Sequence, residues 1–234
     1  MTSGVQLVRS ADRFATDWGW LDSRHSFSFG QHYDANNTGF GVLLVSNEDV
    51  VAPGAGFETH PHRDMEILTW VLEGALTHAD SIGNGAPIRP GEVQVMSAGT
   101  GILHSEHNHS DARTHLLQIW IRPDRHGLAP RYDHRTIDRA AMHNQLAEIA
   151  GAKGGTGLVS LHQDVRILAA DLEPETAIEH TLRPGRGLWI QVTKGAVRLG
   201  NLVLQQGDGA AVEGEPAVRL TAMHPAQVLL FDLH

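Results

Sequence analysis

Residues 69–80 read TWVLEGALTHAD, and residues 89–99 read RPGEVQVMSAG. A similar pair of segments returns later in the chain, as LWIQVTKGAVRLG at residues 188–200 and QQGDGAAVEGE at residues 205–215. Each copy contains an apolar run, a glycine, a second short run, and then a glycine–acid turn that leads into a third run. Short apolar runs bounded by such turns are typical of β-strands.

The glycines of the two copies keep nearly the same spacing. Gly74 corresponds to Gly195 and Gly91 corresponds to Gly207, at offsets of 121 and 116 residues. Self-similarity at a nearly fixed offset indicates a duplicated structural unit. The sequence therefore predicts two tandem β-barrels of about equal size.

The remaining segments also favour an all-β protein. Further short runs, such as GVLLVSNEDVV, HLLQIWI and QVLLFDL, are separated by Gly, Pro, Asn and Asp. We expect barrels of the jelly-roll type with few short helices. The polar stretch at residues 122–138 contains two prolines and marks the boundary. We assign residues 1–130 to an N-terminal barrel and residues 131–234 to a C-terminal barrel.

One segment conflicts with this interpretation. Residues 136–151, TIDRAAMHNQLAEIAG, favour a helix on propensity alone. Two tandem barrels instead require a linker turn here, followed by the first strand of the second barrel. Because tertiary context overrides propensity, we expect no long helix over residues 140–150.

Composition excludes several classes of protein. A net charge of −9 without a Lys/Arg cluster argues against a nucleic-acid partner. No apolar run is long enough to span a bilayer, and the N-terminus lacks a signal-peptide core, so we expect a cytoplasmic protein with no membrane partner. The absence of cysteine excludes disulfides, thiolate ligands and a Cys nucleophile. We also expect a monomer.

Two pairs of side chains have the spacing of metal ligands. His60 and His62 flank a proline in FETHPHRDMEILTW, and His104 and Glu106 follow a Gly-rich turn in AGTGILHSE. Side chains two residues apart share one face of a strand, so each pair can offer two ligands to one ion. Three imidazoles and one carboxylate would leave two positions of a six-coordinate ion free for substrate and oxygen. This set extends the two-His-one-carboxylate sites of non-haem iron oxygenases.

These motifs, together with their neighbours, resemble the pirin branch of the cupin superfamily. The segments that carry the resemblance are G-x5-HPH-x3-E from Gly54 to Glu66, the Pro90-Gly91 pair, AGTGILHSE, GWLDSRHSFSFGQHYD, HLLQIWI and HQD. The likeness covers nearly the whole chain, is most specific in the N-terminal half, and is greatest to the bacterial pirin-like quercetinases. It implies a bicupin fold with one metal in the N-terminal barrel.

The resemblance also implies ligands and chemistry. The metal would be held by His60, His62, His104 and Glu106, and Glu106 would be catalytic by taking the substrate's hydroxyl proton. The cofactor would be one divalent transition metal, with Fe(II) expected and Mn, Ni, Co, Cu or Zn as alternatives. The reaction would be the dioxygen-dependent cleavage of flavonols such as quercetin.

Several alternatives remain open. In the general cupin pattern the carboxylate ligand would be Glu66, which we place outside the ligand set because it lies four residues beyond His62. Gln118 could bond a ligand near the metal or be a satisfied core residue. Adding the repeat offset to His60 and His62 leads to Thr181 and Arg183, so we expect the second barrel to be metal-free, with His180 alone nearby. The rival functions are a redox-sensing regulator of pirin type, or an oxygenase or isomerase for another small enol.

Overall fold

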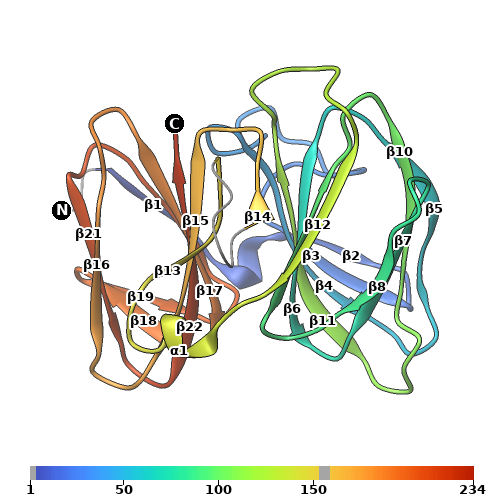
Figure 1. Ribbon diagram of the computed structural model, residues 1–234. Helices are drawn as coiled ribbons and strands as arrows, with labels where there is room; N and C mark the ends of the chain where they lie inside the picture. The colour runs from blue at the N-terminus through green and yellow to red at the C-terminus, as the bar shows by residue number, and fades with distance from the viewer. Residues whose placement is uncertain (1–3, 153–158) are drawn as a thin grey trace. The chain divides into compact units, whose positions relative to one another are not determined.

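The computed structural model describes residues 4–152 and 159–234. Within these residues the chain is built almost entirely of β-strands, with one α-helix of four residues and one 3-10 turn (Figure 1). The predicted all-β fold with few short helices is therefore confirmed. The chain divides into two compact units. The N-terminal unit contains residues 14–137 and a segment that ends at Gln163, and the C-terminal unit contains the described residues up to Arg13, residues 138–151 and residues 164–234.

Two antiparallel sheets form the N-terminal unit. The larger has the order β12-β9-β6-β11-β4-β3-β2, with bounds β12 Arg131–Thr136, β9 Glu92–Ser97, β6 Glu66–Glu73, β11 Thr114–Ile121, β4 Leu43–Val51, β3 Leu21–His25 and β2 Phe14–Asp17. The smaller has the order β5-β10-β7-β8, with bounds β5 Gly56–His62, β10 Ile102–His107, β7 Leu76–Asp80 and β8 Gly85–Ile88. Both sheets contribute to one apolar cluster of Leu21, Val51, Val71, Leu76, Ile88 and Leu116. The inner faces of the two sheets therefore enclose the core of this unit.

The C-terminal unit repeats the arrangement. Its larger sheet contains β1-β20-β17-β22-β15-β13, with bounds β1 Val5–Val8, β20 Gly209–Val212, β17 Gly187–Lys194, β22 Ala226–Leu233, β15 Val165–Leu172 and β13 Ala147–Gly151. Its smaller sheet has the order β16-β21-β18-β19, with bounds β16 Ala177–Thr181, β21 Ala217–Ala222, β18 Ala196–Leu199 and β19 Leu202–Gln205. The short β14 (Val159–Ser160) belongs to the N-terminal unit. One cluster of buried aliphatic side chains fills the C-terminal unit.

The matching glycines of the two repeats occupy the same structural position. Gly74 links β6 to β7 with a φ of 77°, and Gly195 links β17 to β18 with a φ of 70°. A Cβ atom would lie 2.8 Å from the carbonyl oxygen of Arg113 at the first site and 2.1 Å from that of Pro225 at the second. Both positions therefore require glycine, for the left-handed backbone and for the close approach of the chain. This explains the spacing that predicts the duplication.

The segment with helical propensity forms very little helix. The helix α1 spans only Arg139–Met142, with the Asp138 side chain capping its first turn, and β13 follows at Ala147–Gly151. The preference for a turn and a strand over a long helix is confirmed. No helix in the described part of the chain has the length and apolar character needed to cross a membrane.

The structure differs from the predicted domain boundary at both ends of the N-terminal barrel. The first strand, β1, pairs with β20 and so belongs to the C-terminal unit. At the other end, β12 pairs with β9, and the C-terminal unit resumes only at Asp138. A strand that leaves its neighbours in sequence to pair with a distant strand gives no local signal, because pairing partners are set by tertiary packing.

Candidate metal centre

Three histidines converge between neighbouring strands of the smaller sheet. His60 and His62 lie on β5, and His104 lies directly opposite His60 on β10. The ring centroids are 4.4 Å apart for His60 and His104, and 4.8 Å apart for His62 with either partner. One nitrogen from each ring lies within 4.8 Å of the other two. The alternation predicted from the HxH motif aligns His60 and His62, and the pairing of β10 with β5 adds His104, so three imidazoles meet at one point.

A β-bulge sets the pairing at this point. His104 pairs with His60, but Glu106 pairs with Phe57, so two residues of β5 lie opposite one residue of β10. Bulges of this kind redirect side chains next to functional sites. The Nδ1 atom of His60 is 2.7 Å from the carbonyl oxygen of Glu58. Because a carbonyl only accepts, Nδ1 must be the donor, and the lone pair of a neutral His60 is left on Nε2.

The chemistry of the cluster suits a transition metal. Burial lowers the pKa of His62 to about 4 and that of His104 to about 2, with the neighbouring imidazoles adding to the effect. Both rings are therefore neutral at pH 7, which is the form that binds metal. The Nε2 atom of His104 is buried and has no hydrogen-bond partner among the described residues. A buried, unpaired imidazole nitrogen beside two other imidazoles is the donor set that zinc, copper, iron and nickel prefer.

Glu106 lies next to this cluster on the same face of β10. Its carboxylate accepts hydrogen bonds from Gln118 Nε2 at 2.7 Å and from Thr69 Oγ1 at 3.2 Å. Burial raises the pKa of Glu106 to about 7, and the charge of Asp49 adds to the increase, whereas the two hydrogen bonds oppose it. Glu106 has an oxygen within 4.8 Å of nitrogens of both His104 and His78. The structure thus brings Glu106 to His104, while its membership of one ligand set with His60 and His62 stays a prediction.

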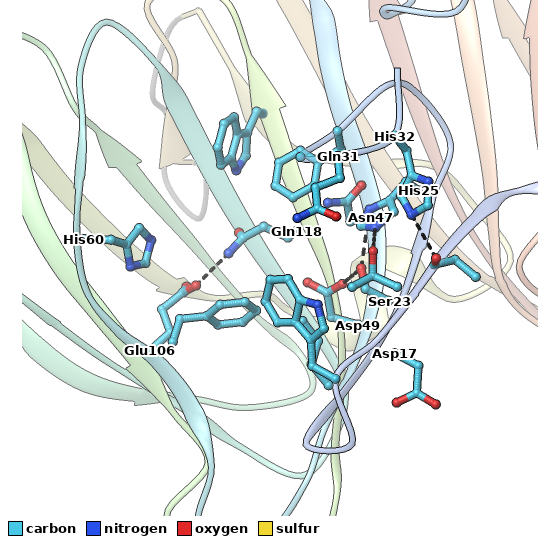
Figure 2. Close-up of a pocket in the computed structure, with 18 of the residues that line it drawn as sticks. Asp17, Ser23, His25, Gln31, His32, Asn47, Asp49, His60, Glu106 and Gln118 are labelled. Carbon is cyan, nitrogen blue, oxygen red and sulfur yellow. Dashed lines mark hydrogen bonds between the residues drawn. The ribbon is translucent and has the colours of Figure 1, made fainter. Parts of the chain in front are cut away.

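A cavity of about 610 Å³ opens beside the cluster. Its wall includes the aromatic side chains of Trp18, Phe29, Phe57 and Trp120. Figure 2 shows His60 and Glu106 on one side of this cavity and a group of polar residues on the other. Those polar residues are Ser23, His25, Gln31, His32, Asn47 and Asp49.

Sequence reasoning did not identify Ser23, Asn47 and Asp49 as part of the wall of the cavity. Ser23 donates a hydrogen bond to the Asp49 carboxylate, His25 Nδ1 lies 3.4 Å from Ser23 Oγ, and Thr16 Oγ1 lies 2.9 Å from His25 Nε2. Burial raises the pKa of Asp49 to about 6, against the opposing effect of the Ser23 hydrogen bond. A signal was present, since Ser23 and His25 are two residues apart, as are Asn47 and Asp49. Only the register of β3 against β4, which places Ser23 opposite Asp49, joins the two pairs.

Glu66 lies away from the histidine cluster. It is the first residue of β6 in the larger sheet, and its carboxylate accepts hydrogen bonds from Ser97 Oγ at 2.9 Å and from the backbone N–H of His162 at 3.2 Å. The alternation of side chains along a strand cannot be extended from His62 to Glu66. β5 ends at His62, and the chain turns at Asp64, which has a φ of 48°. These contacts tie Glu66 to Ser97 and His162, and its place outside the ligand set stays a prediction.

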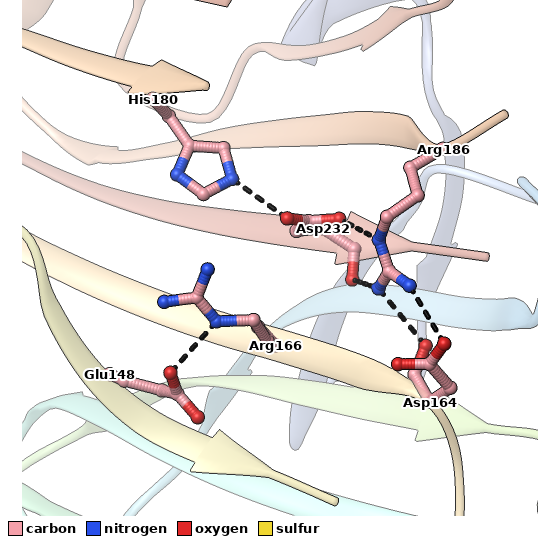
Figure 3. A network of polar contacts seen from close by, with 6 residues as sticks. All are labelled: Glu148, Asp164, Arg166, His180, Arg186 and Asp232. Carbon is pink, nitrogen blue, oxygen red and sulfur yellow. Dashed lines mark hydrogen bonds and ion pairs between the residues drawn. The ribbon is translucent and has the colours of Figure 1, made fainter. Parts of the chain in front are cut away.

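His180, the histidine near the counterpart of the HxH motif in the second barrel, has other partners. Figure 3 shows His180 beside Asp232, with a distance of 2.9 Å from His180 Nε2 to the carboxylate. Arg186 donates to the same carboxylate and, at 2.9 Å, to that of Asp164. The hydrogen bonds from His180 and Arg186 lower the pKa of Asp232, despite the opposing effect of burial. His180 therefore takes part in a network of polar contacts with Asp232 and Arg186.

Comparison with known proteins agrees with this geometry. The family model for pirin matches residues 7–121, and the model for a quercetinase C-terminal cupin domain matches residues 148–233. The chain is 44% identical over 230 residues to the quercetin 2,3-dioxygenase of Escherichia coli strain K12, covering 98% of each protein. It is also 44% identical over 237 residues to a putative quercetin 2,3-dioxygenase of Mycobacterium tuberculosis strain H37Rv, covering 100% of this chain and 97% of that one.

A solved structure gives the same result for the fold. The bacterial pirin YhhW from Escherichia coli, in complex with nickel(II), superimposes with a TM-score of 0.93 at 42% identity, covering 98% of each chain. Similarity of this extent spans both units. The chain therefore belongs to the pirin family, with two cupin domains.

Proposed function

We propose that this protein is a metal-dependent dioxygenase that opens the central ring of flavonols such as quercetin. The observation that carries the proposal is the cluster of three imidazoles beside a cavity whose wall includes the buried carboxylate of Glu106. Its relatives named as quercetin 2,3-dioxygenases support the same substrate and dioxygen as co-substrate.

The cavity suits a flat, hydroxylated aromatic molecule. Its volume of about 610 Å³ lies within the range of sites for small organic ligands. Aromatic side chains such as Phe29, Phe57 and Trp120 offer faces and edges against which a planar ring can pack. Ser23, Asp49 and other polar side chains of the wall can bond hydroxyl groups at the periphery of such a ring.

Glu106 is the proposed base. The O–H bond of the flavonol 3-hydroxyl breaks, the proton moves to a Glu106 oxygen, and the electron pair stays on the substrate oxygen as an enolate. The raised pKa of Glu106, about 7, suits it to accept a proton near neutral pH. Gln118 and Thr69 hold the carboxylate in place through their hydrogen bonds.

His60, His62, His104 and Glu106 are the proposed ligands of the metal. A divalent ion at this position supplies charge that stabilises an enolate and open coordination positions for dioxygen chemistry. Fe(II) is the proposed metal, because iron sites of this kind contain imidazole and carboxylate ligands. Nickel in a relative keeps Ni as an alternative, together with Mn, Co, Cu and Zn.

The test is oxygen uptake by protein loaded under anaerobic conditions with each of these metals in turn. We expect Fe(II)-loaded protein to consume dioxygen when quercetin is present. The flavonol absorbance of the mixture should fall at the same rate as dioxygen is consumed. A panel of other small enols serves as the comparison. Turnover of another enol but not of quercetin would show that the proposed substrate is wrong. No turnover by any metal form would refute the proposed enzyme function and favour a regulatory protein.

A further inference from the structure

His78 and Asp80 lie beside the cluster of three histidines and take no part in the proposed reaction. They are on β7, which pairs with β10 so that Asp80 is opposite His104 and His78 is opposite Glu106. The side chains of both are fully buried. His78 Nδ1 lies 3.4 Å from His104 Nδ1, and His78 Nε2 lies 3.1 Å from Asp80 Oδ2.

Asp80 is held so that it can only accept hydrogen bonds. Its Oδ1 atom accepts from the backbone N–H groups of Ile82 at 3.0 Å and Asn84 at 2.9 Å, and the Asn84 amide lies 3.0 Å from Oδ2. N–H donors therefore lie against both oxygens of the carboxylate, which is the arrangement that stabilises its ionised form. An ionised carboxylate has no proton to donate, so the proton between Asp80 and His78 belongs to His78 Nε2.

The remaining protons follow from this assignment. A neutral imidazole carries one N–H group, so His78 Nδ1 is an acceptor and the hydrogen bond between the two rings must come from His104 Nδ1–H. The lone pair of His104 is then on Nε2, which is the buried atom without a partner among the described residues. Tyr132 stacks on the ring of His78, with centroids 4.9 Å apart and an interplanar angle of 27°, and so limits its rotation.

We propose that Asp80 and His78 are positioning residues that fix the tautomer and orientation of His104, so that its Nε2 atom faces the metal. This inference rests on the proposed metal site, and it assigns His78 as a support of a ligand and not as a ligand itself. Groups that bond to ligating imidazoles in this way raise their basicity and hold their orientation. Here the support passes through a second imidazole to a carboxylate.

Two substitutions at one position separate support from ligation. In His78→Asn, a side-chain oxygen takes the place of Nδ1 and can accept from His104, whereas His78→Leu offers no acceptor. We expect His78→Leu to weaken metal binding about 10- to 100-fold, the usual effect of losing a partner of a ligand. We expect His78→Asn to stay within a few-fold of wild type. His115→Leu is the matched control, because His115 is paired with Glu48 at 2.9 Å on another strand, β11.

Metal affinity is measured by competition with a chelator, and the tautomer by ¹⁵N NMR of the metal-free proteins. We expect His104 to carry its proton on Nδ1 in wild type and in His78→Asn, and to lose this preference in His78→Leu. An equal loss of affinity in both variants would make His78 a ligand and overturn the proposal. An unchanged tautomer in His78→Leu would also overturn it. Because neither readout uses quercetin, a failure of the proposed enzyme activity would be seen separately.

Discussion

The roles proposed for Glu106 place two opposing requirements on its carboxyl. A proposed ligand and base must be ionised, yet burial raises the pKa of Glu106 to about 7, which favours the neutral acid. The hydrogen bonds from Gln118 and Thr69 stabilise the ionised form in part. A carboxyl balanced between its two forms near neutral pH can both accept a substrate proton and release it afterwards.

We predict that Glu106→Gln loses activity even when its metal content is complete. Glutamine still offers an oxygen to the ion but has no useful basicity. Loss of a general base costs about 10²–10⁴ in rate, so turnover of quercetin per bound metal should fall within that range. The measurement is turnover with metal counted independently. Glu66→Gln is the control, because Glu66 bonds to Ser97 and His162, and full activity per metal in Glu106→Gln would exclude the role in proton transfer.

Asp49 makes stability depend on pH. Its pKa rises from 3.8 in the unfolded chain to about 6 when buried, so the folded state binds more protons between these values. Asp49 therefore contributes a fall in unfolding free energy of up to about 3 kcal/mol as pH rises from about 4 to 6, which opposes the rise contributed by His62 and His104. Asp49→Asn should remove this contribution, so the unfolding free energy of the variant minus that of wild type should increase as pH rises through this range.

The measurement is denaturant unfolding of metal-free protein from pH 4 to 8. Asp22→Asn, an exposed carboxyl on the neighbouring strand β3, controls for the loss of one negative charge. An unchanged pH slope in Asp49→Asn would show that Asp49 is ionised throughout this range.

The site depends on how closely strands β5 and β10 approach each other. Gly56 begins β5, and a Cβ atom there would lie 2.2 Å from the carbonyl oxygen of Glu106 and 2.6 Å from the Cα atom of His107. Both are backbone contacts that no side-chain rotation can relieve. Gly56 therefore permits the spacing that brings His60 to His104.

We predict that Gly56→Ala pushes the two strands apart, weakens metal binding by at least 10-fold, and lowers the melting temperature. Gly85→Ala is the matched control in the same sheet, because its Cβ atom would meet nothing closer than 3.5 Å. Metal titration and thermal unfolding of both variants give the result. Equal metal affinity in the two variants would mean that the strand spacing does not limit the site.

The same elements show how far the sequence could predict the site. Alternation along a strand is local, so the inward-facing pair His60 and His62 could be recognised from spacing alone. Asp49 and His78 could not, because their roles depend on which strands pair and in which register. The bulge in β5 and the turn at Asp64 likewise change the phase of alternation, and a count of residues cannot detect either.

For the whole molecule, the duplicated fold could be predicted because it depends on glycine turns that recur at a fixed offset. The assignment of β1 could not be predicted, since its partner β20 lies some 200 residues away. The contact is extended by Arg9, which donates to Asp208 at 2.7 Å and to the carbonyl oxygen of Val203 at 2.7 Å. The expectation of a monomer stays a prediction.

We predict that deleting residues 1–8 destabilises the C-terminal unit. β1 forms the edge of its sheet, and its Val5 and Leu7 pack against the buried cluster of that unit. Without β1, β20, whose four residues are all buried, becomes the edge strand of the sheet, paired only with β17 and open to association with other chains. Loss of these partly buried side chains should cost about 2–4 kcal/mol of unfolding free energy.

Thermal unfolding and light scattering measure the effect, with deletion of residues 1–3 as the control that leaves β1 in place. Metal content at low temperature should be unchanged, because His60, His62 and His104 belong to the N-terminal unit. Identical melting and scattering of the two deletions would show that β1 contributes nothing to the stability of the fold.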